Sequence, residues 1–309
     1  MESFQITLAN VLVTLFYILP GFIVCKMRKA TADHLPSMSA LLVYIGTPFL
    51  VVRSFMRLPL SWEVVRNMVY FFLATLITQA LFMLLIYVVI RKRVADGKYR
   101  VMTIGSIMGN VGFFGIPVLT ALYPNEPLVT CYAAVFMLTM NLLAFTIGVF
   151  CLTGEKKYMS IRAAVCNPTT FSFLIAMPIY LFGIGKYFPE VFQNAIGTVG
   201  DMTAPLCMFI LGIRLASAPL KDIFSQPTVY ITAVLKLLVF PLFCYAAVYF
   251  LPLSEMFKAS ILVLSGMPCA SVVLSLAEMH KSEMKMSANC IMVSTLLSFL
   301  TIPLLTLVL

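Results

Sequence analysis

Hydrophobic residues fill most of the chain in long stretches, which are interrupted by short polar or charged segments. Each stretch is close to the roughly 20 mainly apolar residues that an α-helix needs to cross a bilayer. Little chain remains between the stretches for a domain outside the membrane. The pattern predicts ten transmembrane helices, at residues 4–25, 38–57, 66–90, 100–122, 128–152, 168–186, 197–216, 228–250, 257–278 and 287–309.

The composition fits a chain that has lipid as its main solvent. Hydrophobic residues make up 61% of the 309 residues and charged residues only 11%, whereas a soluble domain carries about a quarter charged residues. The first apolar stretch has no basic residue before Lys26 and no signal-cleavage pattern, so we interpret it as a retained helix. The predicted fold class is an all-α membrane protein.

Lysine and arginine are distributed unequally between the loops. The loops after odd-numbered spans hold Lys26, Arg28, Lys29, Arg91, Lys92, Arg93, Lys98, Arg100, Lys156, Lys157, Arg162, Arg214, Lys221, Lys281 and Lys285. The other loops hold only Arg57, Arg66, Lys186 and Lys258. Because cytoplasmic loops carry the excess of basic residues, we expect a multi-pass protein of the cytoplasmic membrane with both termini outside. The basic residues form no stripe with interleaved aromatics, so no nucleic-acid partner is expected.

Short patterns of the first half recur in the second half at offsets of about 150 to 160 residues, as an internal repeat would require. Pro20 matches Pro178, Pro48 matches Pro205, Pro117 matches Pro268, and Asn141 matches Thr295. Since each repeat holds five spans, an odd number, the second repeat enters the membrane with opposite polarity. We therefore predict two inverted five-helix repeats, 1–155 and 156–309, the plan typical of secondary transporters.

Two of the expected spans contain residues that break helices. Span 100–122 includes Gly105, Gly109, Asn110, Gly112, Gly115 and Pro117, and span 257–278 includes Ser265, Gly266, Pro268 and Ser271. Proline removes an amide donor and clashes with the preceding turn, so we expect broken helices 4 and 9. Unwound backbone at this depth must be buried in protein or line a cavity. The matched breaks therefore indicate a substrate site.

The breaks also suggest the charge of the substrate. We expect Pro117 and Pro268 at the first position of the second half-helices, where a missing amide hydrogen does no harm. The free N–H groups and positive dipole ends beside them would attract an anion such as a carboxylate. The candidate substrate-binding residues are Asn110, Gly112, Gly115, Pro117, Ser265, Gly266, Pro268, Ser271, Asn141 and Lys236.

Several polar residues within the spans allow more than one interpretation. Asn141 could bind substrate or hydrogen-bond a neighbouring helix. Lys236 lies too deep for its ammonium to reach the interface easily, which makes it a functional candidate. Arg53 and Asp201 could be functional, could reach the interface, or could form a structural ion pair.

Enzyme chemistry finds little support. The histidines, His34 and His280, fall in predicted loops, and neither HExxH nor a nucleotide-binding pattern occurs. The eight cysteines form no CxxC pair. An intramembrane aspartyl protease needs two aspartates, and Asp201 has no second aspartate within the spans. We expect no enzyme activity, no cofactor and no metal.

The segment Gly109–Pro117, together with Ala204–Leu206 and Thr301–Pro303, resembles the auxin efflux carrier family over essentially the whole chain. The bacterial branch of that family includes proposed malate and malonate permeases. The short segment 154–166 favours this compact branch over plant members, which carry a long loop there. The resemblance implies scaffold spans 1, 2, 6 and 7, transport (crossover) spans 3–5 and 8–10, substrate beside the crossing of spans 4 and 9, and a homodimer.

We therefore expect a secondary transporter that moves a small organic anion, such as malate, malonate or an auxin-like weak acid, by elevator-type alternating access. Its coupling ion would be a proton or sodium. Two alternatives stay open: a sodium-coupled anion importer of the bile-acid type, and a membrane sensor that binds its ligand without transporting it.

Overall fold

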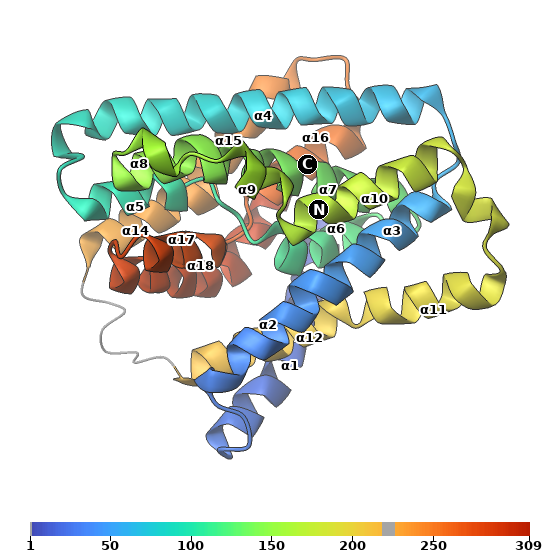
Figure 1. Cartoon of the computed structure of the whole chain (residues 1–309), viewed down its shortest axis with the longest axis horizontal. Helices are drawn as coiled ribbons and strands as arrows, with labels where there is room; N and C mark the ends of the chain where they lie inside the picture. Colours follow the sequence, from blue (N-terminus) through green and yellow to red (C-terminus); the bar gives the residue numbers. More distant parts are fainter. Residues whose placement is uncertain (1, 218–225) are drawn as a thin grey trace.

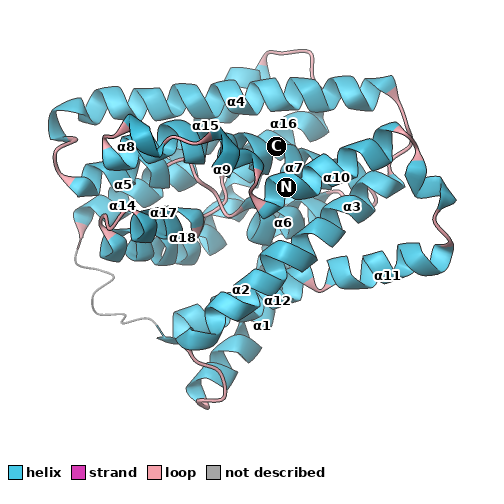
Figure 2. Ribbon diagram, in the orientation of Figure 1, coloured by secondary structure: helices cyan, strands magenta, loops and turns pink. Residues whose placement is uncertain are grey.

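The computed structural model describes residues 2–217 and 226–309, and Figure 1 shows the path of the chain. Lys221, one of the basic residues assigned to a cytoplasmic loop, lies outside the described residues. Helices and loops make up the described part, which contains no β-strand (Figure 2). The prediction of an all-α chain is confirmed.

The helices are α1 (Glu2–Lys26), α2 (Leu35–Leu41), α3 (Thr47–Arg57), α4 (Trp62–Ile90), α5 (Gly97–Gly105), α6 (Ile116–Leu122), α7 (Pro127–Leu143), α8 (Val149–Thr153), α9 (Ile161–Val165), α10 (Pro168–Leu181), α11 (Glu190–Asp201), α12 (Thr203–Ser217), α14 (Pro227–Val234), α15 (Phe240–Tyr249), α16 (Glu255–Ser265), α17 (Val272–Met279) and α18 (Met284–Leu305). Four π-helical stretches connect or precede some of these helices. They are Leu42–Gly46, Val111–Gly115, Ala144–Gly148 and Leu235–Val239.

Seven helical segments among the described residues, some of them with short breaks, are long and apolar enough to cross a membrane. They are Ala32–Arg57, Trp62–Arg93, Pro127–Thr153, Lys156–Leu181, Glu190–Ser217, Pro227–Tyr249 and Met284–Val308, with a shorter apolar helix at Phe16–Lys26. Large hydrophobic side chains such as Leu81 and Val89 of α4 are exposed on their outer faces, where lipid chains replace water as the solvent. The chain is a multi-pass membrane protein.

Polar residues in the loops set several helix starts. The Ser61 hydroxyl accepts a hydrogen bond from the amide of Glu63 at the start of α4 (3.2 Å). Ser254 caps α16 in the same way through the amide of Phe257 (3.2 Å). Such caps satisfy amides that have no partner within the helix.

The long helices pack in two groups. In the first group α1 lies along α12, and α3 packs against α10 and α11 (Figure 1). Glycines permit the close approach of α1 and α12: a Cβ atom at Gly21 would lie only 2.2 Å from the carbonyl oxygen of Phe209, and one at Gly212 only 2.2 Å from that of Ile18. Small residues at such contacts are typical of membrane helix pairs, because packing there depends on close backbone approach.

The second group contains α4, α7 and α14–α18, and α7 also packs against α3 and α10 of the first group. The long helix α4 runs along one edge of the molecule (Figure 1) and packs against α7 and α15. Phe71 of α4 stacks on Tyr132 of α7 with ring centroids 4.4 Å apart, and Phe257 of α16 meets Phe71 edge-on at 4.9 Å. Aromatic contacts therefore join three helices of this group.

Two segments differ clearly from the predicted spans. The span expected at 168–186 corresponds to the segment Lys156–Leu181. The span expected at 197–216 extends from Glu190 to Ser217, because α11 continues almost directly into α12. Asp201 consequently lies in the middle of this segment rather than near its start. Gly197 and Gly200 face α3, where a Cβ atom at Gly200 would lie 3.0 Å from the Cα of Leu50. Packing against α3 therefore stabilises the helical turns that precede the predicted start of the span at residue 197.

Candidate functional site

Two non-helical segments meet in the interior of the protein. The helix α5 ends at Gly105 and α16 ends at Ser265, and the chain resumes a helical path only at Val111 and Val272. Between these ends the two segments pair antiparallel through a single bridge from Gly109 to Cys269. We call residues 106–110 and 266–271 the crossing.

Hydrogen bonds across the crossing satisfy backbone groups that the helices leave without partners. The amide of Asn110 donates to the carbonyl of Pro268 (2.7 Å), and the amide of Ala270 donates to the carbonyl of Met108 (3.0 Å). The amide of Cys269 donates to the Ser294 hydroxyl of α18 (2.9 Å). Because an unpaired backbone group in lipid costs several kcal/mol, this mutual pairing makes non-helical backbone tolerable here.

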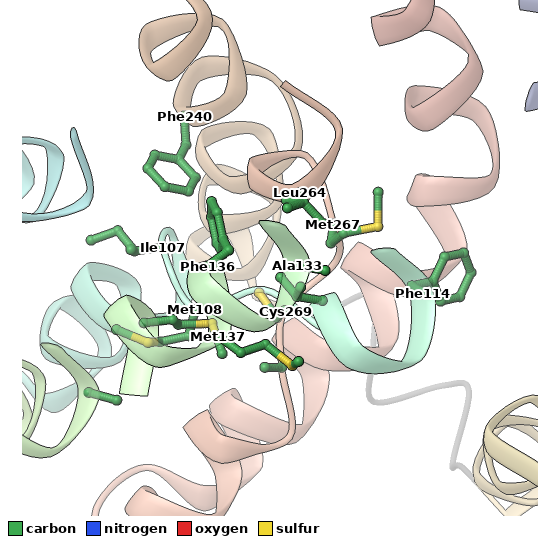
Figure 3. Packing of buried hydrophobic residues seen from close by; sticks show 14 of the residues in the cluster. Ile107, Met108, Phe114, Ala133, Phe136, Met137, Phe240, Leu264, Met267 and Cys269 are labelled. Atoms are coloured by element: carbon green, nitrogen blue, oxygen red, sulfur yellow. The ribbon is translucent and has the colours of Figure 1, made fainter. Parts of the chain in front are cut away.

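Sulfur-containing and aromatic side chains enclose the crossing. Figure 3 shows Met108, Met137 and Cys269 close together, with Phe136 and Met267 nearby. The Cys269 thiol donates to the carbonyl of Gly105 at 3.0 Å. Flexible methionines fill irregular gaps well, so the crossing is closely packed on this side.

The expected position of Pro268 is wrong, and that of Pro117 agrees with the structure only within one residue and only for the α-helical part of its half-helix. Pro117 is the second residue of α6, but α6 continues a π-helical stretch that begins at Val111, so the helical path resumes six residues before Pro117. Pro268 lies within the crossing, four residues before α17 begins at Val272. The reason is physical: the amide of Asn110 donates to the carbonyl of Pro268, and this bond holds both residues out of helical geometry.

A central cavity of about 260 Å³ lies beside the crossing. It is lined by Val43, Thr47, Gly109, Asn110, Val111, Gly112, Met137, Met140, Asn141, Phe145, Asn167, Thr169, Ala270, Ser271, Val272 and Ser275. The predicted residues Asn110, Gly112, Asn141 and Ser271 come together here. Their polar groups face a cavity whose lining contains no charged side chain.

The other predicted residues lie outside this cavity. The Ser265 hydroxyl donates to the carbonyl of Ile261 within α16 (2.6 Å). A Cβ atom at Gly266 would lie 2.5 Å from Leu305, and one at Gly115 would lie 2.9 Å from Leu264, so both glycines serve close packing. Pro268 contributes its carbonyl to the crossing.

Lys236 is wholly buried (0% exposed) and does not line the cavity. Its ammonium donates to the carbonyl of Ser265. The ammonium lies behind Gly109, where a Cβ atom would be 3.1 Å from Nζ. Lys236 is therefore next to the crossing without facing the cavity.

Asn167 and Thr169, which the sequence interpretation did not single out, also line the cavity. Asn167 is the N-cap of α10: its side-chain oxygen accepts from the amide of Thr169 (3.0 Å). The same oxygen accepts from the Asn141 side-chain amide at 3.4 Å. Asn141 thus both lines the cavity and bonds a neighbouring helix. The Asn167-Pro168 pair, an N-cap followed by a first-turn proline, was the available signal.

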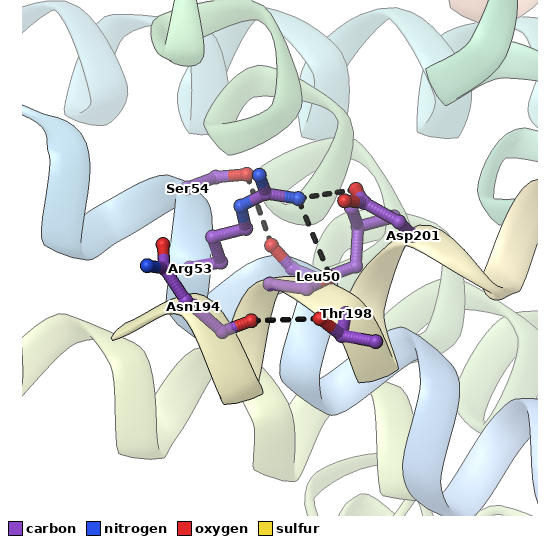
Figure 4. Close-up of polar contacts among 7 residues, drawn as sticks. Leu50, Arg53, Ser54, Asn194, Thr198 and Asp201 are labelled. Carbon is purple, nitrogen blue, oxygen red and sulfur yellow. Dashed lines mark hydrogen bonds and ion pairs between the residues drawn. The ribbon is translucent and has the colours of Figure 1, made fainter. Parts of the chain in front are cut away.

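Two larger cavities adjoin the central one. The Arg53 vestibule (about 530 Å³) is lined by Arg53, Arg57, Glu126, Asp201 and Pro117, and shares Gly112 with the central cavity. In it Arg53 forms an ion pair with Asp201 (Figure 4) and donates to the carbonyl of Gly197 (3.3 Å). This pair links α3 to α11.

The Arg214 vestibule (about 650 Å³) lies on the other side of the central cavity. It is lined by Leu35, Arg214, Glu278 and Lys285, and shares Ser271 and Ser275 with the central cavity. The three cavities therefore adjoin in series, with the crossing at the middle.

Comparisons with known proteins agree on a family. Residues 6–306 match the model of the membrane transport protein family. An uncharacterized transporter of Methanothermobacter thermautotrophicus is 26% identical over 304 residues, covering 97% of each chain. An uncharacterized transporter of Methanocaldococcus jannaschii is 25% identical over 301 residues, covering 95% of this chain and 96% of its own. These matches confirm the resemblance recognised in the sequence.

Proposed function

Because the chain belongs to the membrane transport protein family and is a transporter rather than an enzyme, we propose that it carries a small organic anion across the cytoplasmic membrane. The substrate class is a carboxylate such as malate or malonate, or an auxin-like weak acid. The observation that carries this proposal is the central cavity, in which neutral polar groups gather beside the crossing without a carboxylate among the described lining residues.

The helix ends at the cavity favour a negative ligand. Ser271 and Val272, at the start of α17, line the cavity, and so do Asn110 and Val111, where the helical path resumes after the first break. The helix dipole is positive at the start of a helix, and this dipole acts on the cavity although the amides of Asn110 and Val111 already donate to the carbonyls of Pro268 and Gly109. Two such ends converging on one cavity suit a carboxylate.

We further propose a ten-span topology. The seven long segments are supplemented by α1 and by two interrupted spans, α5 with α6 and α16 with α17, which are too short singly to cross a bilayer. The matching places of the interruptions in residues 1–155 and 156–309 support two inverted repeats. The charge distribution supports a location of both termini outside.

The proposed mechanism is elevator-type alternating access. The scaffold would comprise α1–α3 and α10–α12, and the transport domain α4–α8 and α14–α18. The central cavity lies between these groups: Thr47, Asn167 and Thr169 line it from the scaffold side, and Asn110 and Ser271 from the transport side. A vestibule adjoining each end of the cavity gives a substrate access from either side. A homodimer through the scaffold helices belongs to the same proposal.

Flux into proteoliposomes tests the proposal. Labelled malate, malonate and indole-3-acetate are offered separately, with and without sodium or a proton gradient. We expect saturable flux of at least one anion, and a large loss of that flux in Asn110→Ala. The matched control is Asn194→Ala, which removes an exposed amide from α11.

The outcomes separate the competing functions. Flux that requires sodium would identify a sodium-coupled importer. Saturable binding without flux would identify a sensor. Full flux in Asn110→Ala would reject the central cavity as the substrate site.

A further inference from the structure

Lys236 is the one fully buried charged side chain in the described part of the chain. It belongs to the π-helical stretch Leu235–Val239 between α14 and α15. At about 1.5 Å per residue, it lies about 13 Å along the helix from Pro227. Ionisable groups at such depth are costly and are usually retained for a function.

Two groups beside Lys236 interact favourably with its positive charge. Its ammonium donates to the carbonyl of Ser265, the last residue of α16, and carbonyls at a helix C-terminus carry partial negative charge. The ammonium also lies 4.8 Å from the centre of the Phe240 ring, which attracts cations through its face. None of the ion pairs among the described residues includes Lys236.

Gly109 is close both to Lys236 and to the central cavity. Gly109 lines that cavity, and a Cβ atom built on it would lie 3.1 Å from Nζ and 3.4 Å from Cε of Lys236. A positive charge and a carboxylate in the cavity would therefore face each other across one residue of closely packed protein. Because Lys236 is buried, water screens this attraction less than it would at a surface.

We propose that Lys236 is a fixed countercharge for the transported anion, acting through the crossing without touching the substrate. This inference rests on the proposed function and specifies how that site handles charge. Lys236 moves with the transport helices. With a monocarboxylate bound, its negative charge balances the positive charge of Lys236, which is the one fully buried charge among the described residues of the moving unit. Without substrate the charge of Lys236 is unbalanced.

The charge balance determines which step responds to voltage. In an export cycle the anion leaves together with Lys236 in a neutral step, and Lys236 returns alone. Over the whole cycle one negative charge moves outward. The membrane potential acts only on the step in which the transport domain returns without substrate. For a charge crossing the whole field, 100 mV changes the equilibrium of that step about 50-fold.

A voltage-jump experiment on the purified protein in lipid membranes tests this. Without any substrate, the wild type should give a transient displacement of up to about one elementary charge per protein, with the sign of a moving cation. Lys236→Gln keeps a hydrogen-bond donor for Ser265 but should abolish the transient, and Lys236→Arg should retain it. Lys186→Gln, an exposed scaffold position, is the control and should match the wild type.

Three results would overturn the inference: an unchanged transient in Lys236→Gln, no transient in a wild type that carries labelled anion, or a wild-type transient whose size and sign stay the same when the transported anion is saturating. The last two need no variant, so they hold even if Lys236→Gln does not fold. Absence of flux for all three offered anions would instead reject the proposed function.

Discussion

The amide of Asn110 donates a 2.7 Å hydrogen bond to the carbonyl of Pro268, from the other half of the chain. This bond joins the two non-helical segments at the point where the cavity lies. Because the backbone of Asn110 is occupied in this way, the position of its side chain on the cavity wall is fixed by the crossing itself. Each half of the protein therefore holds part of the proposed site in place for the other.

A negative charge at Asn167 should weaken anion binding. In Asn167→Asp the side-chain oxygens can still accept from the amide of Thr169 and from Asn141, so the cap of α10 is kept. The added carboxylate would repel a bound anion, and we expect the Kd to rise at least about tenfold, or about 1.4 kcal/mol. Equilibrium binding of the transported anion to purified protein measures this.

Asn167→Ser is the matched control for that charge, since serine is also a good N-cap and is neutral. Its Kd should stay within a few fold of the wild-type value. Equal affinities of Asn167→Asp and wild type would show that the anion does not occupy the central cavity.

The sequence was informative where local chemistry decides the structure. The glycine-rich segment that begins at Gly105 marks the end of α5, and the apolar stretches coincide with the long helices. The features that the sequence did not reveal depend on contacts between residues that are far apart in the sequence. The pairing of Gly109 with Cys269 moved the resumption of the helix away from Pro117, and the contact of Asn141 with Asn167 brought an unconsidered residue to the cavity.

The close contact of α1 and α12 predicts a strong effect on stability. Gly21→Val would place side-chain atoms within about 2–3 Å of the Phe209 backbone, as its ideal Cβ already lies 2.2 Å from that carbonyl oxygen. The helices would have to separate, and we expect a loss of about 3 kcal/mol. Thermal unfolding in detergent measures it. Leu19→Val, at an exposed position of the same helix, should leave the Tm nearly unchanged; equal Tm values for the two variants would contradict the packing.

The native Cys166 offers a test of the proposed topology. It is the one exposed cysteine among the described residues, and it lies between spans 5 and 6, where the basic residues predict the cytoplasm. A membrane-impermeant maleimide should label it in inside-out vesicles and not in intact cells. Asn125→Cys in a Cys166→Ser background, exposed between α6 and α7, should show the opposite pattern. Labelling of both from one side would reject the ten-span arrangement.

The elevator mechanism predicts that one cross-link stops transport and another does not. Asn141 and Asn167 lie on the proposed transport domain and scaffold, with their side-chain amide and oxygen 3.4 Å apart. In a Cys166→Ser background, Asn141→Cys with Asn167→Cys should be bridged by a short bis-methanethiosulfonate reagent. The bridge would fix the moving group to the stationary one, so flux should fall to background and return on reduction to the level of the untreated double variant.

The control cross-link lies within the scaffold. Cys25 of α1 and Ser217 of α12 have their Sγ and Oγ atoms 3.3 Å apart, so Ser217→Cys should form a disulfide with the native Cys25 after oxidation. Both helices belong to the proposed scaffold, and flux should continue. Each single-cysteine variant, treated in the same way, shows whether the reagent alone affects transport. Continued flux with residues 141 and 167 bridged would mean that these two helices do not move relative to each other, and the proposed division into scaffold and transport domain would be wrong.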